Sequence, residues 1–195
     1  MLRPYSRRSP ARPRCAIDAW VDERWTLLER HERTVAAAPE LALRALAELR
    51  PRDLPAVRAL FTLRGMRHAP DATLRGFFSA APFVLLEEVT GRELVSGVLL
   101  PQRGADGRRR PPSTRDAFRR DLDAAPVAAV ATFRADPRGE GAALWTETWV
   151  RTNGAAAGAG FAAYWLAIGP WSAWIRRILL RAARDAAETG PPRAR

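Results

Sequence analysis

The chain has 195 residues, of which 47% are hydrophobic and 27% are charged, and its formal net charge is +11. This composition excludes a disordered tail, a collagen-like chain and a low-complexity chain, and the length fits one domain with short tails. The sequence contains no lysine, so every basic residue is an arginine. A phosphate-binding loop with a Gly-Lys pair, a Schiff-base lysine and a Tyr-x-x-x-Lys reductase site are therefore excluded.

The positive charge is concentrated in three segments. Residues 1–14 hold five arginines and no acidic residue, residues 102–120 hold seven arginines and two aspartates, and residues 190–195 hold two arginines. The rest of the chain has a net charge of −1. The part of the chain that we expect to fold is therefore close to neutral.

This distribution predicts how the chain divides. We expect a disordered basic leader over residues 1–20, a single folded domain over residues 21–189 with a flexible basic loop at 102–113, and a disordered tail over residues 190–195. Solvated segments do not form the structured basic face that follows a phosphate backbone, so no specific nucleic-acid binding is expected. The alternative is an interaction protein whose arginine-rich segments contact an acidic partner.

Cysteine content and hydropathy bear on the compartment. Cys15 is the only cysteine, which excludes an intrachain disulfide and favours a reducing, cytoplasmic location. Residues 152–175 carry no charge and precede Arg176-Arg177, as in a membrane-spanning helix. Their alanine and glycine content and the pair Gly169-Pro170 favour a buried helix instead. No stable membrane insertion is therefore expected.

The predicted elements begin with a strand over residues 25–35, whose ends are rich in β-forming residues and whose middle is polar. Pro39 then opens a helix that Pro51 stops. Asp53 is expected to cap a second helix that ends at Gly65. The folded part thus begins with one strand and two short helices.

Two β-hairpins are expected next. Residues 83–89 and 93–100 flank a short glycine-containing turn, and residues 127–135 and 142–152 flank a turn rich in proline and glycine. Between the hairpins, Ser113 is expected to cap a brief helix. The pattern indicates an antiparallel sheet rather than alternating strand and helix units.

The last predicted element is the longest, a helix from about residue 160 to 188 with apolar side chains at steps of three and four. Gly169-Pro170 should kink it. The order of elements predicts an α+β fold, in which the long C-terminal helix covers one face of a curved antiparallel sheet.

Three stretches of this pattern resemble the START-like or SRPBCC superfamily of helix-grip domains, and especially its uncharacterised bacterial members. Residues 164–177 (YWLAIGPWSAWIRR) are similar to their C-terminal helix, with a Tyr-Trp pair, a mid-helix proline and an Ile-Arg-Arg. Residues 144–150 (LWTETWV) resemble a late strand, and residues 37–40 (AAPE) resemble the entry from the first strand into the first helix. One departure is Trp149, which stands where an arginine is expected.

The resemblance implies a curved sheet that wraps around the C-terminal helix and leaves a cavity for a hydrophobic ligand between them. The superfamily includes lipid carriers, hormone receptors and polyketide aromatase/cyclases, so the likeness implies a fold and a cavity but no particular reaction. We expect the chain to bind a small hydrophobic or aromatic molecule without a cofactor. The alternative is an aromatase/cyclase-type enzyme that uses acid/base residues in the cavity.

Glu147 is the first candidate for such a residue. Strand alternation places it between Trp145 and Trp149 on one face of the late strand. On a face that lines the cavity, its carboxyl group could act as a general acid/base or anchor a ligand. The favoured alternative is a structural ion pair with Arg33 or Arg134 of a neighbouring strand.

His31 and Tyr164 are the other candidates for proton transfer. His31 shares strand parity with Glu29 and Arg33, and histidine titrates near neutral pH. The favoured alternative for His31 is a surface or hydrogen-bonded strand histidine. Because His68 is the only other histidine and no cysteine cluster exists, no metal site is expected.

The C-terminal helix completes the expected binding site. Three of the seven tryptophans lie on it, and core packing is sufficient to explain most of them, although a wall of indoles would also suit a flat aromatic ligand. The expected ligand-lining residues are Trp145, Glu147, Trp149, Tyr164, Trp165 and Ile168. The sequence makes no prediction of oligomeric state.

Overall fold

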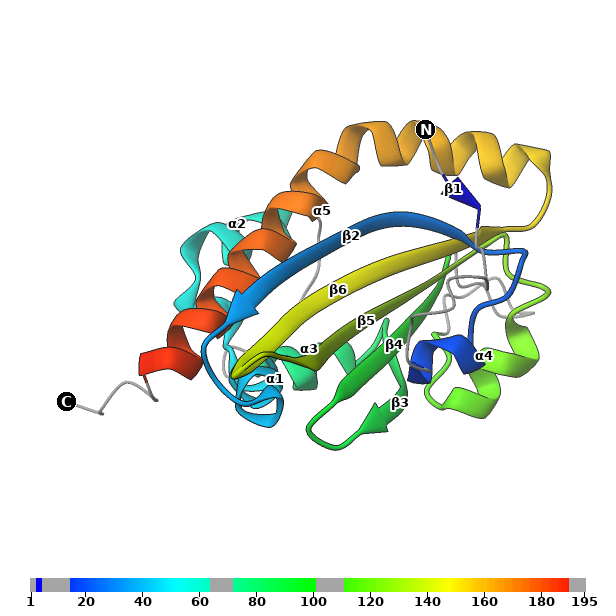
Figure 1. The fold of residues 1–195 in the computed structure, drawn as a ribbon. Coiled ribbons are helices and arrows are strands. Elements are labelled where there is room, and N and C mark those ends of the chain that lie inside the picture. The colour runs from blue at the N-terminus through cyan, green and yellow to red at the C-terminus, as the bar shows by residue number, and fades with distance from the viewer. Residues whose placement is uncertain (1–2, 5–14, 64–71, 101–110, 190–195) are drawn as a thin grey trace.

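A computed structural model describes residues 3–4, 15–63, 72–100 and 111–189. In this part of the chain, antiparallel strands form one curved sheet and a long C-terminal helix packs against it (Figure 1). The order across the sheet is β1-β2-β6-β5-β4-β3. The α+β helix-grip architecture predicted from the sequence is confirmed, with two short helices after the first long strand.

The elements follow the predicted order with shifted ends. The strands are β1 (Arg3–Pro4), β2 (Thr26–Val35), β3 (Val84–Val89), β4 (Glu93–Leu100), β5 (Val127–Arg138) and β6 (Gly141–Thr152). The helices are η1 (Ala16–Ala19), α1 (Pro39–Glu48), η2 (Pro51–Asp53), α2 (Pro55–Leu63), α3 (Leu74–Phe78), α4 (Arg115–Asp121) and α5 (Ala155–Thr189).

The strands β3 to β6 form a meander, and β2 extends the sheet by pairing with β6. In that pairing Glu29 lies opposite Thr148, and His31 lies opposite Thr146. The turn from β5 to β6 contains Gly139, whose φ of +57° favours glycine. Because β2 lies near the N-terminus and pairs with the last strand, β6, residues far apart in the sequence lie side by side in the sheet.

One face of the sheet is covered by α1, α2, α3 and the C-terminal half of α5. The apolar face of α1 provides Leu43 and Leu46, which are buried against Leu144 of β6 and against Leu179 and Leu180 of α5. Burial of each such side chain stabilises the fold by about 1.5–3 kcal/mol. This core, here called the helix-side core, fixes the position of the second half of α5.

The opposite face of the sheet is covered by η1, α4 and the segment between η1 and β2. Ile17, Trp20 and Trp25 are buried there, against Trp145 and Trp149 of β6. The predicted leader over residues 1–20 was therefore too long, because residues 15–20 belong to the folded domain. These residues fold with the domain because their apolar side chains cover a sheet face that would otherwise be exposed to water.

Other differences are local. Asp53 does not cap α2, because it lies in the short turn η2 that precedes that helix, and Thr114 rather than Ser113 caps α4. The helix α3 and the turn η1 were not predicted. Gly65 and His68, residues 1–2 and 5–14 of the predicted leader, most of the predicted basic loop and the tail lie outside the described residues.

The helix α5 begins at Ala155, five residues before the expected start, and contains Pro170. Figure 1 shows it bending between a half that runs along β2 and a half beside α1 and α2. Its second half is anchored by buried side chains, among them Ile175 and Leu179, whereas large side chains of its first half stay partly or largely exposed. Among the described helices, none is both long enough and apolar enough to cross a membrane.

Candidate functional site

A polar cluster lies between the sheet and α5, where the helix passes from its buried half to its exposed half. Strand alternation directs Glu29 and His31 of β2 toward the helix, and Thr146 and Thr148 lie opposite them on β6. Ser172 and Arg176 reach the cluster from α5, and their spacing of four residues puts them on one helix face. Three elements therefore meet at this point.

The Glu29 carboxylate is the centre of the cluster. Its Oε1 accepts hydrogen bonds from Ser172 Oγ at 2.7 Å, from Arg176 Nε at 2.8 Å and from Thr148 Oγ1 at 3.4 Å. Its Oε2 lies 3.1 Å from His31 Nε2. Only 7% of the Glu29 side chain is exposed, so its carboxylate is hydrogen-bonded to protein donors instead of water.

These contacts keep Glu29 ionised. Burial of the carboxyl group works to raise its pKa, but the hydrogen bond from His31, the charge of Arg176 and the hydrogen bond from Ser172 lower the pKa to about 2. A carboxyl group with that pKa cannot hold a proton near neutral pH. Glu29 therefore acts as a fixed negative charge and not as a general acid.

Arg176 ties the helix to both strands of the cluster. Besides its bond to Glu29, it donates from Nη1 to Thr146 Oγ1, and its guanidinium carbon lies 5.5 Å from the centre of the Phe133 ring. The side chain is only 11% exposed, so its charge is compensated mainly by Glu29. The buried pair has no net charge.

His31 is oriented by Glu29. An ionised carboxylate can only accept hydrogen bonds, so His31 Nε2 donates to Glu29 Oε2 and carries the ring proton in the neutral form. Nδ1 then presents a lone pair. Within the part of the chain that the structure describes, that atom has no hydrogen-bond partner, and the side chain is 12% exposed.

An aromatic stripe on α5 continues from this cluster toward the start of the helix. Phe161, Trp165 and Ile168 precede Ser172 at steps of four, three and four, on the helix face that turns toward the sheet. The rings of Phe161 and Trp165 stack with centroids 6.0 Å apart. All three side chains are half-buried, whereas Ile175, one turn beyond Ser172, is buried at 5% exposure.

A small cavity lies beside α3 and not between the sheet and α5, where the resemblance implies a ligand cavity. A cavity of about 10 Å³ lies between α3 and strands β3, β4 and β5, and its walls include Phe78, Leu94 and Phe133. That volume holds about one water molecule. Beside the polar cluster, the stripe of Phe161, Trp165 and Ile168 stays partly open.

The predicted lining residues do not come together. Trp145 and Trp149 are buried in the core that η1 and α4 cover, and Glu147 shares their strand parity, so these three lie on the face turned away from α5. Trp165 and Ile168 lie on the other side of the sheet. The predicted cavity wall is thus divided between two faces, because α5 packs over the alternate side chains of β6, including Leu144 and Thr146.

Glu147 forms a structural ion pair. Its Oε1 accepts from Arg30 Nη1 at 3.3 Å, its Oε2 accepts from Trp149 Nε1 at 3.0 Å, and its side chain is 1% exposed. The expected partners were Arg33 and Arg134. Arg33 lies opposite Leu144 and so on the other face, whereas Arg134 engages a different set of groups.

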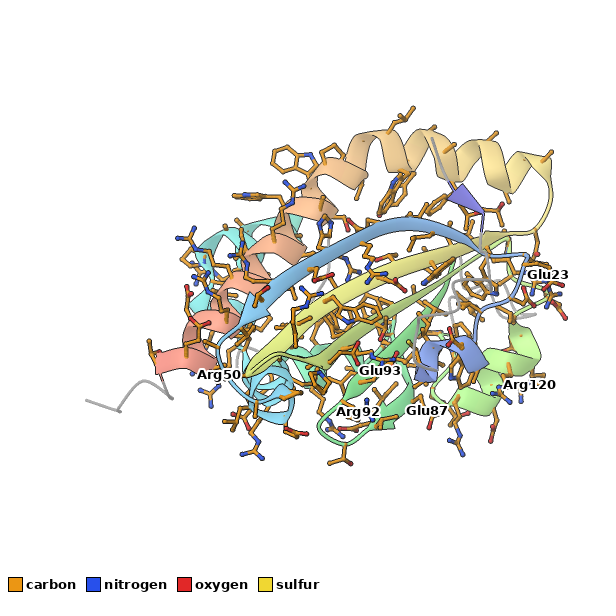
Figure 2. The ribbon with its side chains drawn as sticks, viewed as in Figure 1. Glu23, Arg50, Glu87, Arg92, Glu93 and Arg120 are labelled. Atoms are coloured by element: carbon orange, nitrogen blue, oxygen red, sulfur yellow. The ribbon has the colours of Figure 1, made fainter. Side chains whose placement is uncertain are left out.

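The groups around Arg134 hold the N-terminal segment onto the sheet. Glu93 of β4 accepts from Ala16 N at 2.7 Å, from Ile17 N at 3.2 Å and from Thr132 Oγ1 at 2.8 Å. Arg134 lies 3.6 Å from Glu93 and donates to Cys15 Sγ. Figure 2 shows Glu93 inside the molecule, in contrast to Arg50 and Arg120 at its periphery.

Tyr164 lies at the edge of the aromatic stripe. It is 41% exposed, and its ring centroid is 5.9 Å from that of Phe161. The site residues that sequence reasoning missed are Ser172 and Arg176. Two signals were available, namely the Ile-Arg-Arg that contains Arg176 and the spacing of four residues between Ser172 and Arg176 on the helix face of the apolar stripe.

Metal binding and sequence similarity add no further assignment. In residues 15–63, 72–100 and 111–189, no group of three or more His, Cys, Asp or Glu side chains is arranged to hold a metal ion. No protein-family model matches the chain, and a search of curated proteins finds no match.

Proposed function

We propose that the protein binds a small hydrophobic or aromatic molecule on the sheet side of the first half of α5, with the polar group of the ligand at His31. The observation that carries this proposal is the change in burial along one helix face. The stripe of Phe161, Trp165 and Ile168 is only half-buried, although it continues directly into the fully buried residues Ile175 and Leu179. A ligand would complete its burial.

Helix geometry sets the size of this ligand. At 1.5 Å per residue, Ile168 lies about 6 Å and Trp165 about 10.5 Å from Ser172 along the helix axis. A molecule of one or two fused rings spans that distance. The stacked rings of Phe161 and Trp165 provide a flat wall against which such a molecule would pack.

The polar cluster sets the charge of the ligand. Because Glu29 and Arg176 neutralise one another, the cluster offers no net charge to an ion. His31 Nδ1 offers one acceptor, and it would accept a hydrogen bond from a hydroxyl or amide group. The preferred ligand is therefore a neutral aromatic molecule with one hydrogen-bond donor.

Proton transfer is the second candidate function, and the Glu29–His31 pair favours it. A carboxylate that accepts from one ring nitrogen holds the imidazole in one tautomer and stabilises the imidazolium form. His31 Nδ1 could then take a proton from an acidic C–H or phenolic O–H of the bound molecule. This would be chemistry of the aromatase/cyclase type.

We also propose that the chain is a START-like domain and that it acts in the cytoplasm. The helix-grip arrangement supports the first proposal, together with the resemblance of residues 164–177 to the C-terminal helix of such domains. The single cysteine of the sequence, Cys15, is buried and forms no intrachain disulfide, which supports the second.

Calorimetric titration with 2-naphthol, a neutral two-ring phenol, tests the binding proposal. Trp165→Ala should weaken binding at least tenfold, whereas Trp174→Ala, on the outer side of the same helix, should leave it unchanged. His31→Ala should weaken binding of 2-naphthol but not of naphthalene, which has no donor. Equal affinity in all variants, or no binding by the wild-type chain, would contradict the proposal.

Solvent deuterium exchange separates binding from catalysis. 2-Tetralone has acidic C–H groups beside its carbonyl, and their exchange in D₂O can be followed by NMR. If His31 is a base, the wild-type chain accelerates exchange and His31→Gln abolishes the acceleration. Binding without acceleration supports a carrier and contradicts the enzyme.

A further inference from the structure

We infer that the outer side of α5, opposite the aromatic stripe, is a surface that docks onto an anionic membrane. This surface, here called the outer patch, consists of exposed residues. They are Leu166, Trp171, Trp174, Arg177 and Arg181. The inference goes beyond the proposed ligand site, because the two surfaces lie on different sides of one helix.

The exposure of the outer patch is unusual for a helix that is packed against a sheet. Leu166 is 82% exposed, Trp171 is 49% exposed and Trp174 is 45% exposed. Figure 1 shows the first half of α5 at the outside of the molecule, beyond β2. Trp171 and Trp174 contact one another, and an exposed apolar cluster of large side chains marks a site of interaction.

The residue types fit a lipid interface. Residues 155–175 contain no charged side chain, and between the large residues the helix carries alanine and glycine. Tyrosine and tryptophan favour the boundary between lipid headgroups and acyl chains, because their rings are apolar with one polar atom. The rings of Trp171 and Trp174 lie 6.4 Å apart and form one aromatic unit.

The charge of α5 specifies an anionic surface. No acidic residue occurs between Glu147 and Asp185, and the exposed Arg177 and Arg181 follow the aromatic unit by one and two turns. An amphipathic helix with aromatic residues beside arginines binds in the plane of an anionic bilayer. Because none of the described helices can cross a membrane, the contact would be peripheral.

A second copy of the chain fits the outer patch less well. The patch contains arginines but no carboxylate, so two copies in contact would offer no opposite charge to Arg177 and Arg181. The next acidic residue, Asp185, is paired with Arg184. Phosphate groups of anionic lipids supply the missing counter-charge.

Vesicle co-sedimentation tests the inference. The full chain is mixed with vesicles of phosphatidylcholine alone, or with one third phosphatidylglycerol. We expect binding only to the anionic vesicles and weaker binding as salt rises. The double variant Arg177→Gln/Arg181→Gln should bind about thirtyfold more weakly, since each arginine near an anionic leaflet contributes about fivefold.

The control variant is Arg115→Gln/Arg120→Gln, which removes the same charge from exposed positions on α4, on the opposite side of the sheet. It should retain most of the binding. Equal losses in both double variants would show a nonlocal effect of net charge and would overturn the inference.

The aromatic unit is tested separately with Trp171→Ala/Trp174→Ala. Both side chains are exposed, so the variant should unfold at the wild-type temperature while losing vesicle binding. Light scattering of the lipid-free wild type and of this variant tests whether a second copy of the chain, instead of a membrane, covers the outer patch. A wild-type dimer that this variant converts to a monomer would show a protein interface and would overturn the membrane proposal, as would undiminished vesicle binding.

Discussion

Arg176 on α5 donates from Nε to the Glu29 carboxylate on β2 at 2.8 Å, which joins two residues 147 positions apart in the sequence. The pair stands where the buried half of the helix ends and the half-buried aromatic stripe begins. Because both side chains are largely removed from water, each depends on the other for charge compensation. This contact therefore fixes the height of α5 above the sheet.

Glu29→Gln should destabilise the chain strongly. The substitution keeps the shape of the side chain but leaves Arg176 as a buried, uncompensated charge, a change that costs about 3–5 kcal/mol. Urea unfolding of both proteins measures the difference. Glu88→Gln is the control, since its pair with Arg75 is 49% and 33% exposed and should be worth about 1 kcal/mol or less. Similar losses in the two variants would contradict the assigned role of Glu29.

The stability of the wild-type chain should also depend on Glu29 in acid. The pKa of Glu29 is about 2 in the folded chain, below its ordinary value of 4.5. A lowered folded-state pKa stabilises the fold above pH 4.5, and the stabilisation is lost as the pH falls toward 2. The difference in unfolding free energy between wild type and Glu29→Gln should therefore shrink by about 3 kcal/mol from pH 5 to pH 2. A difference independent of pH would be inconsistent with this ionisation.

Glu93 should control the attachment of the N-terminal segment. Its carboxylate accepts from the backbone N–H groups of Ala16 and Ile17, beside the buried thiol of Cys15. Glu93→Gln weakens these charge-assisted bonds, and the single thiol then reports local opening. The reaction of Cys15 with a disulfide reagent should accelerate about tenfold or more. The exposed Glu23→Gln in the same segment should not change the rate, and an unchanged rate in Glu93→Gln would argue against the clamp.

The fold was predictable where the signal is local. The turn chemistry between residues 83 and 100 and between 127 and 152, and the proline at position 39, set the hairpins and the start of α1. The turn η1 gave no such signal, because Glu93, more than 70 residues away, satisfies its N–H groups. The order of the elements was thus readable, but the elements that depend on distant partners were not.

The candidate site was only partly predictable, for a similar reason. Strand parity placed Glu29 and His31 on one face, and the structure shows them there. Parity does not say which face meets the helix, and in β6 the side chains on both faces are buried. Glu147 was therefore assigned to the cavity although it lies on the other face. Arg176, the partner of Glu29, becomes visible only once the helix is docked.

Gly141→Ala should disrupt the strand pair that carries the site. A Cβ at this position would lie 2.2 Å from the carbonyl oxygen of Val35, at the end of β2 where it joins β6. Backbone atoms of a central strand cannot move aside without losing their hydrogen bonds, so the loss should exceed about 3 kcal/mol. Gly160→Ala is the matched control, because a Cβ there meets nothing within 4 Å on an exposed helix and should stabilise by about 0.5–1 kcal/mol. Thermal unfolding of both variants gives the comparison, and a Gly141→Ala protein as stable as the wild type would show that β2 does not approach β6 this closely.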